Sequence, residues 1–426
     1  MKKLVALIAL AVLSSSMLNA QTPAKLTKIY PELETKLIEW RRYLHANPEL
    51  SFAEMNTGKL IADSLKSFGL SVKYPVAKTG VIAILKGGKP GPVIGIRADI
   101  DALPVTERAP ISFASKVTAD YAGQKVGVMH ACGHDAHTAI LLATAYALKQ
   151  VQSQLPGTVV FFFQPAEEGN PNGGPGGAET MLKENVMDDP KIDKMYALHM
   201  SAAQPVGTIG YAQGAAMASA DMFKIVVKGK GSHGSMPWGG VDPIMVSAQI
   251  IQNLQTIVSR QSNLTKAPLV ISVGSLHSGV RSNIIPETAE IVGSLRALDE
   301  QMRLDAHASM RKMAKAIAES AGATATVEIN TSTLVTVNDV DLCKKAAPAL
   351  ARAAGADNVK IIPWITGSED FSYFGQKAPA MLFMLGGLPK GKKPEEAAPH
   401  HTPDFYLDES GFIVGVRAFV ELVFNQ

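Results

Sequence analysis

The sequence lacks an excess of charge of either sign. Its 426 residues contain 41 Lys+Arg and 38 Asp+Glu, with no long basic run. Such a chain offers no electrostatic footprint for a polyanion, which argues against nucleic acid as a partner. Hydrophobic residues make up 46% of the chain, enough to bury a sizeable core. At about 150 residues per domain, the length predicts a folded protein of two or three domains.

A hydrophobic run long enough to cross a membrane is also missing. Residues 1–20 combine a short basic start, an apolar stretch from Leu4 to Leu13 and small residues ending in Ala20. This pattern predicts a secretory signal peptide. The apolar stretch is too short to span about 30 Å of hydrocarbon, and no later segment is long enough. We therefore expect an exported protein, periplasmic or released, with no membrane span after processing.

Cysteine is scarce, because only Cys132 and Cys343 are present. An oxidising compartment permits disulfides, so either the two pair or at least one serves another purpose. Cys132 lies between histidines in MHACGHDAHT, which favours a metal ligand over a disulfide or simple packing. The role of Cys343 stays open.

The pattern of apolar residues predicts an α/β fold with a mostly parallel sheet. Apolar residues recur every three or four positions in two segments near the start, which predicts amphipathic helices. Four later runs are almost entirely apolar, as in strands that are buried on both faces, and a helix lies between two of them. The expected helices are Lys25–Leu44, Glu54–Phe68 and His134–Lys149, and the expected strands are Val93–Ala98, Val159–Gln164, Met195–Leu198 and Ala380–Leu385.

From about Ser219 the expected order of elements changes to βαββαβ, the order of a ferredoxin-like unit. We predict a compact second domain at 217–331, inserted into a first domain that comprises 21–216 and 332–426. The elements expected in the insertion are strands Met222–Val227, Leu269–Leu276, Ala289–Leu295 and Thr324–Ile329, with helices Pro243–Ser259 and Glu300–Ser320.

Polar residues follow the ends of the strands predicted for the large sheet. Ligands of open α/β sheets sit at the carboxyl ends of the strands, so these side chains should converge on one crevice. Thiolate, imidazole and carboxylate groups together predict a metal site suited to zinc, with manganese, cobalt or nickel as alternatives. The residues concerned are Asp99, Asp101, Glu167, Glu168 and His199, joined by Cys132 and His134 from the loop before a helix.

Several of these residues have a competing interpretation. His130 and His137 compete with His134 as ligands, and we assign them supporting or capping roles because the three cannot all face one ion. The two aspartates could instead cap a helix or pair with Arg97, and the two glutamates could form a solvated turn.

The motifs RADIDALP, MHACGHDAHT, QPAEEG, GKGSHGSMPWGGVDP, NIIP, GSEDFSYF and HTPDF occur in this order between residues 97 and 405. Together they resemble the amidohydrolase branch of the dinuclear metallo-aminopeptidase and aminoacylase superfamily. Hippurate hydrolases, N-acyl-amino-acid amidohydrolases and plant auxin-conjugate hydrolases belong to this branch. The resemblance covers nearly all of the chain after residue 20. It implies a metal-binding domain with a smaller lid through which two chains form a homodimer.

The resemblance also implies two divalent metal ions per chain, zinc or manganese first and cobalt or nickel second. Glu167 then corresponds to the general base, and Cys132 can bridge the two ions as a thiolate. His400 and His401 are adjacent, and we choose His401 as the last ligand because it directly precedes the Thr-Pro step. The implied ligands are Cys132, His134, Glu168, His199 and His401.

The predicted lid carries three further candidate residues. His233, in the glycine-rich GKGSHGS loop, could donate a hydrogen bond to a tetrahedral oxyanion, and the resemblance suggests that it does so in the partner's site. Asn283 and Arg296 are candidate clamps for a substrate carboxylate, with Arg281 as the competing choice.

These features predict an exported metal-dependent amidohydrolase that cleaves N-acyl amino acids or short peptides with a metal-activated water. A dipeptidase or carboxypeptidase of the same superfamily is the alternative within the enzyme class. A periplasmic solute-binding protein is the alternative outside it, but such a protein has no need for a thiol, several histidines and paired glutamates at strand ends.

Overall fold

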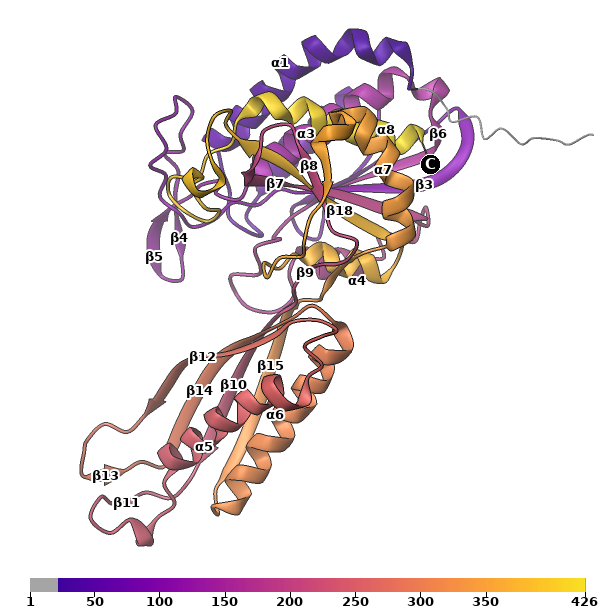
Figure 1. Cartoon of the computed structure of the whole chain (residues 1–426). Helices are drawn as coiled ribbons and strands as arrows, with labels where there is room; N and C mark the ends of the chain where they lie inside the picture. The colour runs from indigo at the N-terminus through magenta and orange to yellow at the C-terminus, as the bar shows by residue number, and fades with distance from the viewer. Residues whose placement is uncertain (1–21, 426) are drawn as a thin grey trace, which may run out of the picture.

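The computed structural model describes residues 22–425, so the predicted signal peptide lies outside the described residues. Figure 1 shows a large α/β part and a long second part that projects from it. Within residues 22–425, no helix is both long and apolar enough to cross a membrane.

The large part is built on an eight-stranded sheet in the order β1-β2-β6-β3-β7-β18-β8-β17. Its centre is parallel, because β3 pairs in parallel with β6 and β7, and β18 pairs in parallel with β7. Antiparallel pairs lie towards the edges. The predicted mostly parallel sheet is confirmed. Its strands are β1 (Ser71–Val76), β2 (Gly80–Lys86), β3 (Lys89–Asp99), β6 (Pro156–Gln164), β7 (Lys194–Pro205), β8 (Ile209–Tyr211), β17 (Val359–Ile361) and β18 (Ala380–Leu388).

Helices cover both faces of this sheet, with α1, α3, α7 and α8 on one face and α4 on the other (Figure 1). Alternate residues of β6 enter the two cores: Phe161 and Phe163 pack under α3, whereas Val160 and Phe162 face α4. Burial on both faces explains why the strands read as unbroken apolar runs. The helices are α1 (Ala24–Ala46), α2 (Met55–Ser67), α3 (His134–Gln150), α4 (Gly177–Lys183), α7 (Val340–Ala354) and α8 (Phe412–Phe424).

The projecting part has a four-stranded antiparallel sheet in the order β12-β14-β10-β15, with α5 and α6 packed against it. This is the ferredoxin-like order expected from the sequence. Its first strand begins at Ala220 and its last ends at Thr333, against predicted limits of 217 and 331. The elements are β10 (Ala220–Lys228), α5 (Pro243–Thr256), a π-helical turn (Ile257–Gln261), β12 (Leu269–Ser278), β14 (Thr288–Ala297), α6 (Glu300–Ser320) and β15 (Thr324–Thr333). We call this part the lid.

Short strand pairs complete the fold. β9 (Gly214–Met217) pairs with β16 (Thr336–Asn338), so the two chain segments that lead into and out of the lid are joined where they meet the large part. β11 (Ser232–His233) pairs with β13 (Ile284–Ile285) at the end of the lid that is farthest from the large sheet (Figure 1). A further hairpin consists of β4 (Thr118–Tyr121) and β5 (Gln124–Gly127).

Candidate metal centre

The predicted ligands come together at the carboxyl ends of the central strands. Glu167 and Glu168 follow β6 after two intervening residues, His199 lies within β7, and His134 is the first residue of α3. Cys132 precedes α3 and is separated from His134 by Gly133, whose φ is +95°. A Cβ at Gly133 would lie 3.1 Å from Met200 Cβ, so glycine lets this turn pack against β7.

Two groups of donor atoms share the sulfur of Cys132. One consists of Cys132, His134 and His199, and the other of Cys132, Glu168 and His401. Within each group, the potential ligand atoms all lie within 4.8 Å of one another. Cys132 Sγ is 3.6 Å from His199 Nε2 and 3.3 Å from His401 Nε2, and that same nitrogen is 3.2 Å from Glu168 Oε1. A thiolate between two groups of nitrogen and oxygen donors is a donor set for two divalent transition-metal ions.

Hydrogen bonds set the tautomers of the two histidines in the first group. His134 Nδ1 lies 2.9 Å from the carbonyl oxygen of Asp101, and His199 Nδ1 lies 2.7 Å from that of Met200. A carbonyl oxygen only accepts, so both Nδ1 atoms carry the proton. Each ring therefore presents its Nε2 lone pair to the centre, the arrangement typical of metal-ligating histidines.

His400 and His401 differ in the same respect. His400 Nε2 accepts the Ala202 N–H at 3.2 Å, so its lone pair is used and Nδ1 carries the proton. That Nδ1 lies 3.5 Å from Cys132 Sγ and can donate to a thiolate. His401 instead directs Nε2 at both Cys132 and Glu168. The geometry favours His401 as the ligand and gives His400 a supporting role.

Two buried donor atoms of this centre have no hydrogen-bond partner. They are His134 Nε2 and Glu168 Oε1, whose 3.2 Å contact with His401 Nε2 lacks hydrogen-bond geometry. A buried polar atom without a partner is costly, so both atoms fit a role as ligands of a bound cation. Neither cysteine is in a disulfide, and burial together with the nearby Glu168 raises the pKa of the Cys132 thiol. A metal ion would reverse that shift, because a coordinating thiol is deprotonated.

Glu167 lies beside the ligands but next to other carboxylates. Its Oε2 is 3.8 Å from His134 Nε2, and its carboxylate also groups with those of Glu369 and Asp370. Burial and the negative charge of Glu369 raise the pKa of Glu167 well above its usual range. A carboxyl group with a raised pKa is suited to taking up and releasing a proton near neutral pH.

The two aspartates after β3 support the histidines. Asp99 pairs with Arg97 at 2.8 Å and with His137 Nδ1 at 2.6 Å, so the predicted alternative of a pair with Arg97 is realised. Asp101 accepts from Ser51 Oγ at 2.6 Å and lies 3.3 Å from His134 Nδ1.

The other two histidines of this motif are buried, and neither belongs to the two donor groups that share Cys132. His137 Nε2 accepts the Met200 N–H, so both of its ring nitrogens are engaged and it has no free lone pair for a metal. His130 is fully buried, neither ring nitrogen has a hydrogen-bond partner, and burial lowers its pKa to about 4.

Two acidic residues of the motif GSEDFSYF reach the site although they are not among the predicted site residues. Glu369 and Asp370 lie 2.9 Å and 3.0 Å from Arg97 Nη2. The motif was noticed only as part of the resemblance, because nothing local predicts contacts with residues almost three hundred positions away. The one local signal for them is that two acidic residues, Glu369 and Asp370, stand side by side in this motif.

A cavity of about 1090 Å³ opens from this centre towards the base of the lid. Arg296 and Arg303 both line it. The guanidinium of Arg303 is engaged by Asp221 and Glu300, whereas Arg296 Nη1 is buried and has no hydrogen-bond partner. One wall is apolar and consists of Met217, Ile362, Ile365 and Met384.

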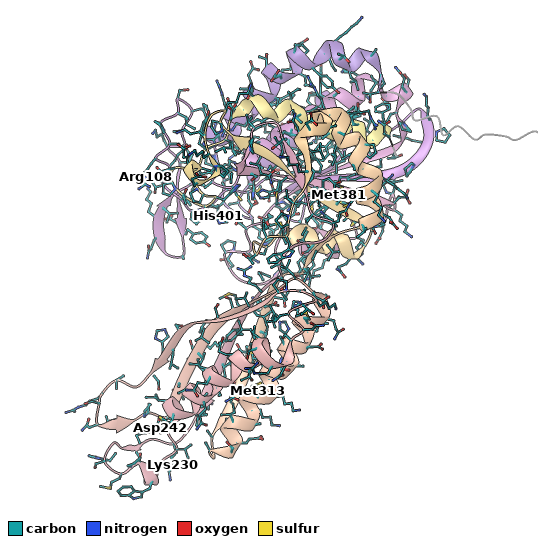
Figure 2. The ribbon with its side chains drawn as sticks, in the orientation of Figure 1. Arg108, Lys230, Asp242, Met313, Met381 and His401 are labelled. Atoms are coloured by element: carbon teal, nitrogen blue, oxygen red, sulfur yellow. The ribbon has the colours of Figure 1, made fainter. Side chains whose placement is uncertain are left out.

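The remaining two candidates lie elsewhere. His233 belongs to β11, and the Asn283 carbonyl accepts the N–H of the adjoining Gly234, so both residues lie at the distal end of the lid. Figure 2 shows the neighbouring Lys230 at that end, far from His401. The structure therefore brings Arg296 to the cavity but does not bring His233 or Asn283 to it within one chain. Their predicted roles stay predictions.

His233 is nevertheless prepared to donate a hydrogen bond. Its Nδ1 accepts the backbone N–H of Ser235 at 3.1 Å. A backbone N–H can only donate, so the neutral ring carries its proton on Nε2.

Comparisons with known proteins agree with this geometry. The model of the peptidase family M20/M25/M40 matches residues 95–425. Thermostable carboxypeptidase 2 of Saccharolobus solfataricus is 40% identical over 396 residues, which cover 92% of this chain and 96% of that protein. N-acyl-L-amino acid amidohydrolase of Geobacillus stearothermophilus is 42% identical over 303 residues, 71% of this chain and 78% of that protein. A solved dinuclear metal-binding peptidase from Bacillus subtilis is similar with a TM-score of 0.76 and 36% identity, and the match covers 92% of this chain and 98% of that one.

Replacing the shared sulfur should affect both groups of ligands. We expect Cys132→Ala to lower the divalent metal content after reconstitution and desalting, because each donor group loses one of its three atoms. Cys343→Ala is the matched control, since that buried thiol lies in α7 and should leave metal content unchanged. Elemental analysis per chain measures both. Unchanged metal content in Cys132→Ala, or a disulfide between the two cysteines in active protein, would contradict the assignment.

Proposed function

The chain belongs to the peptidase family M20/M25/M40 and is a metal-dependent hydrolase of amide bonds; from this premise we propose that it is an exported enzyme that removes the acyl group from N-acyl amino acids. The observation that carries the proposal is the pair of donor groups that share Cys132 beside Glu167, at the mouth of a cavity with one free arginine. The pattern of residues 1–20 supports export to the periplasm or beyond. Membership of the family leaves no support for the solute-binding alternative.

Two divalent ions would be held by Cys132, His134, Glu168, His199 and His401, with zinc or manganese expected before cobalt or nickel. When bound, they lower the pKa of a water molecule towards 7 and polarise the scissile carbonyl.

The rest of the catalytic cycle falls to side chains of the protein. Glu167 accepts the proton that the attacking water loses and delivers it to the departing amine. It can do so because the neighbouring Glu168, not Glu167, completes a donor group with Cys132 and His401. Two adjacent glutamates thus carry out two separate tasks.

The lining of the cavity suits a substrate that has a free carboxylate and an apolar acyl group or side chain. Arg296 offers a buried guanidinium nitrogen without a partner, which a carboxylate would satisfy. The α-ammonium of a dipeptide would instead need a free anionic partner. Of the four carboxylates that line the cavity, Glu167 and Glu168 belong to the proposed metal centre, Glu179 is paired with Lys183 and Asp370 with Arg97. Together with the apolar wall of Met217, Ile362, Ile365 and Met384, this favours N-acyl amino acids over dipeptides.

We further propose a homodimer formed through the lid, in which His233 acts on the partner's site. The supporting observation is the place of β11, at the end of the lid away from the large sheet of its own chain (Figure 1). In a symmetric pair this end can approach the second cavity. There the Nε2 proton of His233 would stabilise the negative charge of the tetrahedral oxyanion.

The division of labour between the two glutamates can be tested by conservative replacement. Glu167→Gln keeps the shape but cannot accept a proton, so kcat should fall by about a hundredfold or more with full metal content. Glu168→Gln should lower metal content instead. Steady-state kinetics and elemental analysis of each variant distinguish the two roles. Equal loss of metal in both variants, or an active Glu167→Gln enzyme, would overturn the proposal.

The role of Arg296 can be tested with paired substrates. Arg296→Met should lower kcat/KM for an N-acyl amino acid by about tenfold or more, because a charge-assisted hydrogen bond is lost. The same substrate with its carboxylate converted to an amide serves as the control and should be affected little. A parallel loss on both substrates would show that Arg296 does not recognise the carboxylate.

The shared site can be tested by mixing two inactive variants, His233→Ala and Glu167→Ala, under conditions that exchange subunits. In the mixed dimer, one site receives Glu167 from its own chain and His233 from the other chain, so activity should reappear. A histidine that acts within its own chain would leave both sites defective. Absence of recovery, with subunit exchange demonstrated by mass-tagged chains, would exclude action across the dimer.

A further inference from the structure

Glu54 is a buried carboxylate that is not among the metal-ligating donors. It is fully buried and directly precedes α2, but its side chain does not cap that helix. Oε1 instead accepts the backbone N–H of Ala166 at 2.9 Å, and Oε2 accepts the hydroxyl of Thr79 at 2.6 Å. Taking an ionisable group out of water costs free energy, so its contact with the residue before Glu167 requires an explanation.

Ala166 has an unusual backbone conformation. Its φ is +48°, in the left-handed region that a residue with a Cβ adopts only at a cost in free energy. Its carbonyl oxygen accepts the Gly177 N–H at 3.0 Å. On the other side of Glu167, the Glu168 N–H donates to Asp101 Oδ2 at 3.1 Å. Glu54 therefore holds the Pro165–Ala166 peptide group and Asp101 holds the Glu167–Glu168 peptide group, so two carboxylates from other segments fix the chain before and after Glu167.

The surrounding packing restricts this loop further. A Cβ at Gly80 would lie 2.6 Å from Pro165 Cδ, and a Cβ at Gly177 would lie 1.5 Å from the Pro165 carbonyl oxygen. β2 and the start of α4 thus press against Pro165. The hydrogen bond from Ala166 to Glu54 fixes the peptide group that comes next.

We propose that Glu54 is a positioning residue for Glu167: by accepting the Ala166 N–H, it holds Ala166 in the left-handed conformation that directs the Glu167 carboxylate into the cavity. This inference rests on the proposed role of Glu167. A proton acceptor displaced by about 1 Å can cost about a hundredfold in rate, so an indirect contact of this kind has a measurable effect.

The test compares Glu54→Ala with Glu54→Gln in the metal-loaded enzyme. Glu54→Ala removes the acceptor, so kcat should fall by about tenfold to a hundredfold, while KM stays within about twofold and metal content is unchanged. Glu54→Gln keeps an oxygen that can accept the Ala166 N–H, and its kcat should stay close to that of the unmodified enzyme.

A second substitution separates positioning from a purely structural role. Glycine enters the left-handed region without a steric cost. Ala166→Gly should therefore restore part of the kcat that Glu54→Ala loses, although the two changes add no contact. Glu49→Ala is the matched control, because Glu49 accepts the N–H groups of Asn56 and Thr57 at the same end of α2 without a hydrogen bond to the loop. It should lower the melting temperature but not kcat.

Three outcomes would overturn the inference: an unchanged kcat in Glu54→Ala, a fall in kcat that Ala166→Gly does not reverse at all, or a loss of metal that accounts for the fall.

If Glu54→Ala does not fold, Thr79→Val replaces it as an isosteric change that frees the Glu54 carboxylate. A smaller fall in kcat, again reversed by Ala166→Gly, is then expected, and its absence would overturn the inference. Glu167→Gln is measured in parallel. If that variant is fully active, the proposed function fails; if it is inactive and Glu54→Ala is active, only the inference about Glu54 fails.

Discussion

The buried guanidinium of Arg97 is the interaction on which the catalytic end of the sheet depends. It donates to Asp99 and Gln164 at 2.8 Å each, and it pairs with Glu369 and Asp370 from a distant segment. Without this charge, the buried carboxylates of Glu369 and Asp370 would have no cationic partner, and Asp99 would keep only its contacts with His134 and His137. Removing one partner of a buried ion pair typically costs about 3–5 kcal/mol, and here one cation serves three anions. Asp99 in turn orients His137, and Asp370 accepts the Ala178 N–H at the start of α4. The position of two loops at the site thus follows from one side chain.

How far the site can be predicted from sequence depends on whether a signal is local. Glu167, Glu168 and His199 are recognisable because each stands at or near the end of an apolar strand, and parallel strands bring such ends together. Cys132 and His134 are recognisable as a pair at the start of a helix. The ion pairs of Arg97 with Glu369 and Asp370 have no local signal in the sequence, because the partners lie more than 270 positions apart. The choice of His401 over His400 follows from the adjoining Thr-Pro step, but a physical reason for it, the Ala202 N–H that occupies His400 Nε2, is visible only in the structure.

The lid contributes to two different places, and this determines what its residues can do. Arg296 ends β14 at the base, where it lines the cavity of its own chain. His233 and Asn283 lie at the opposite end, although Asn283 is close to Arg296 in sequence and both are predicted candidate clamps for a substrate carboxylate. The reason is that β14 runs almost the whole length of the lid, so the thirteen positions from Asn283 to Arg296 extend from one end of the lid to the other. Sequence proximity along an extended strand therefore implies spatial separation, and within one chain Arg296 lines the cavity whereas Asn283 lies away from it.

Backbone conformation at the site follows two different rules. At Gly133, φ is +95° and a Cβ would make a tight 3.1 Å contact with Met200, so both backbone conformation and packing favour glycine. Ala166 and His401 also have positive φ, 48° and 64°, but both carry a Cβ. Their conformations must be maintained by outside contacts: Ala166 donates to Glu54, and His401 donates its N–H to the Ala131 carbonyl at 2.8 Å. At His401 the imidazole itself is needed, so glycine is not an option. At Ala166 no side-chain function is evident. The hydrogen bond to Glu54 offsets the strain of the left-handed conformation. Because alanine has less backbone freedom than glycine, it then keeps the peptide group before Glu167 in one orientation.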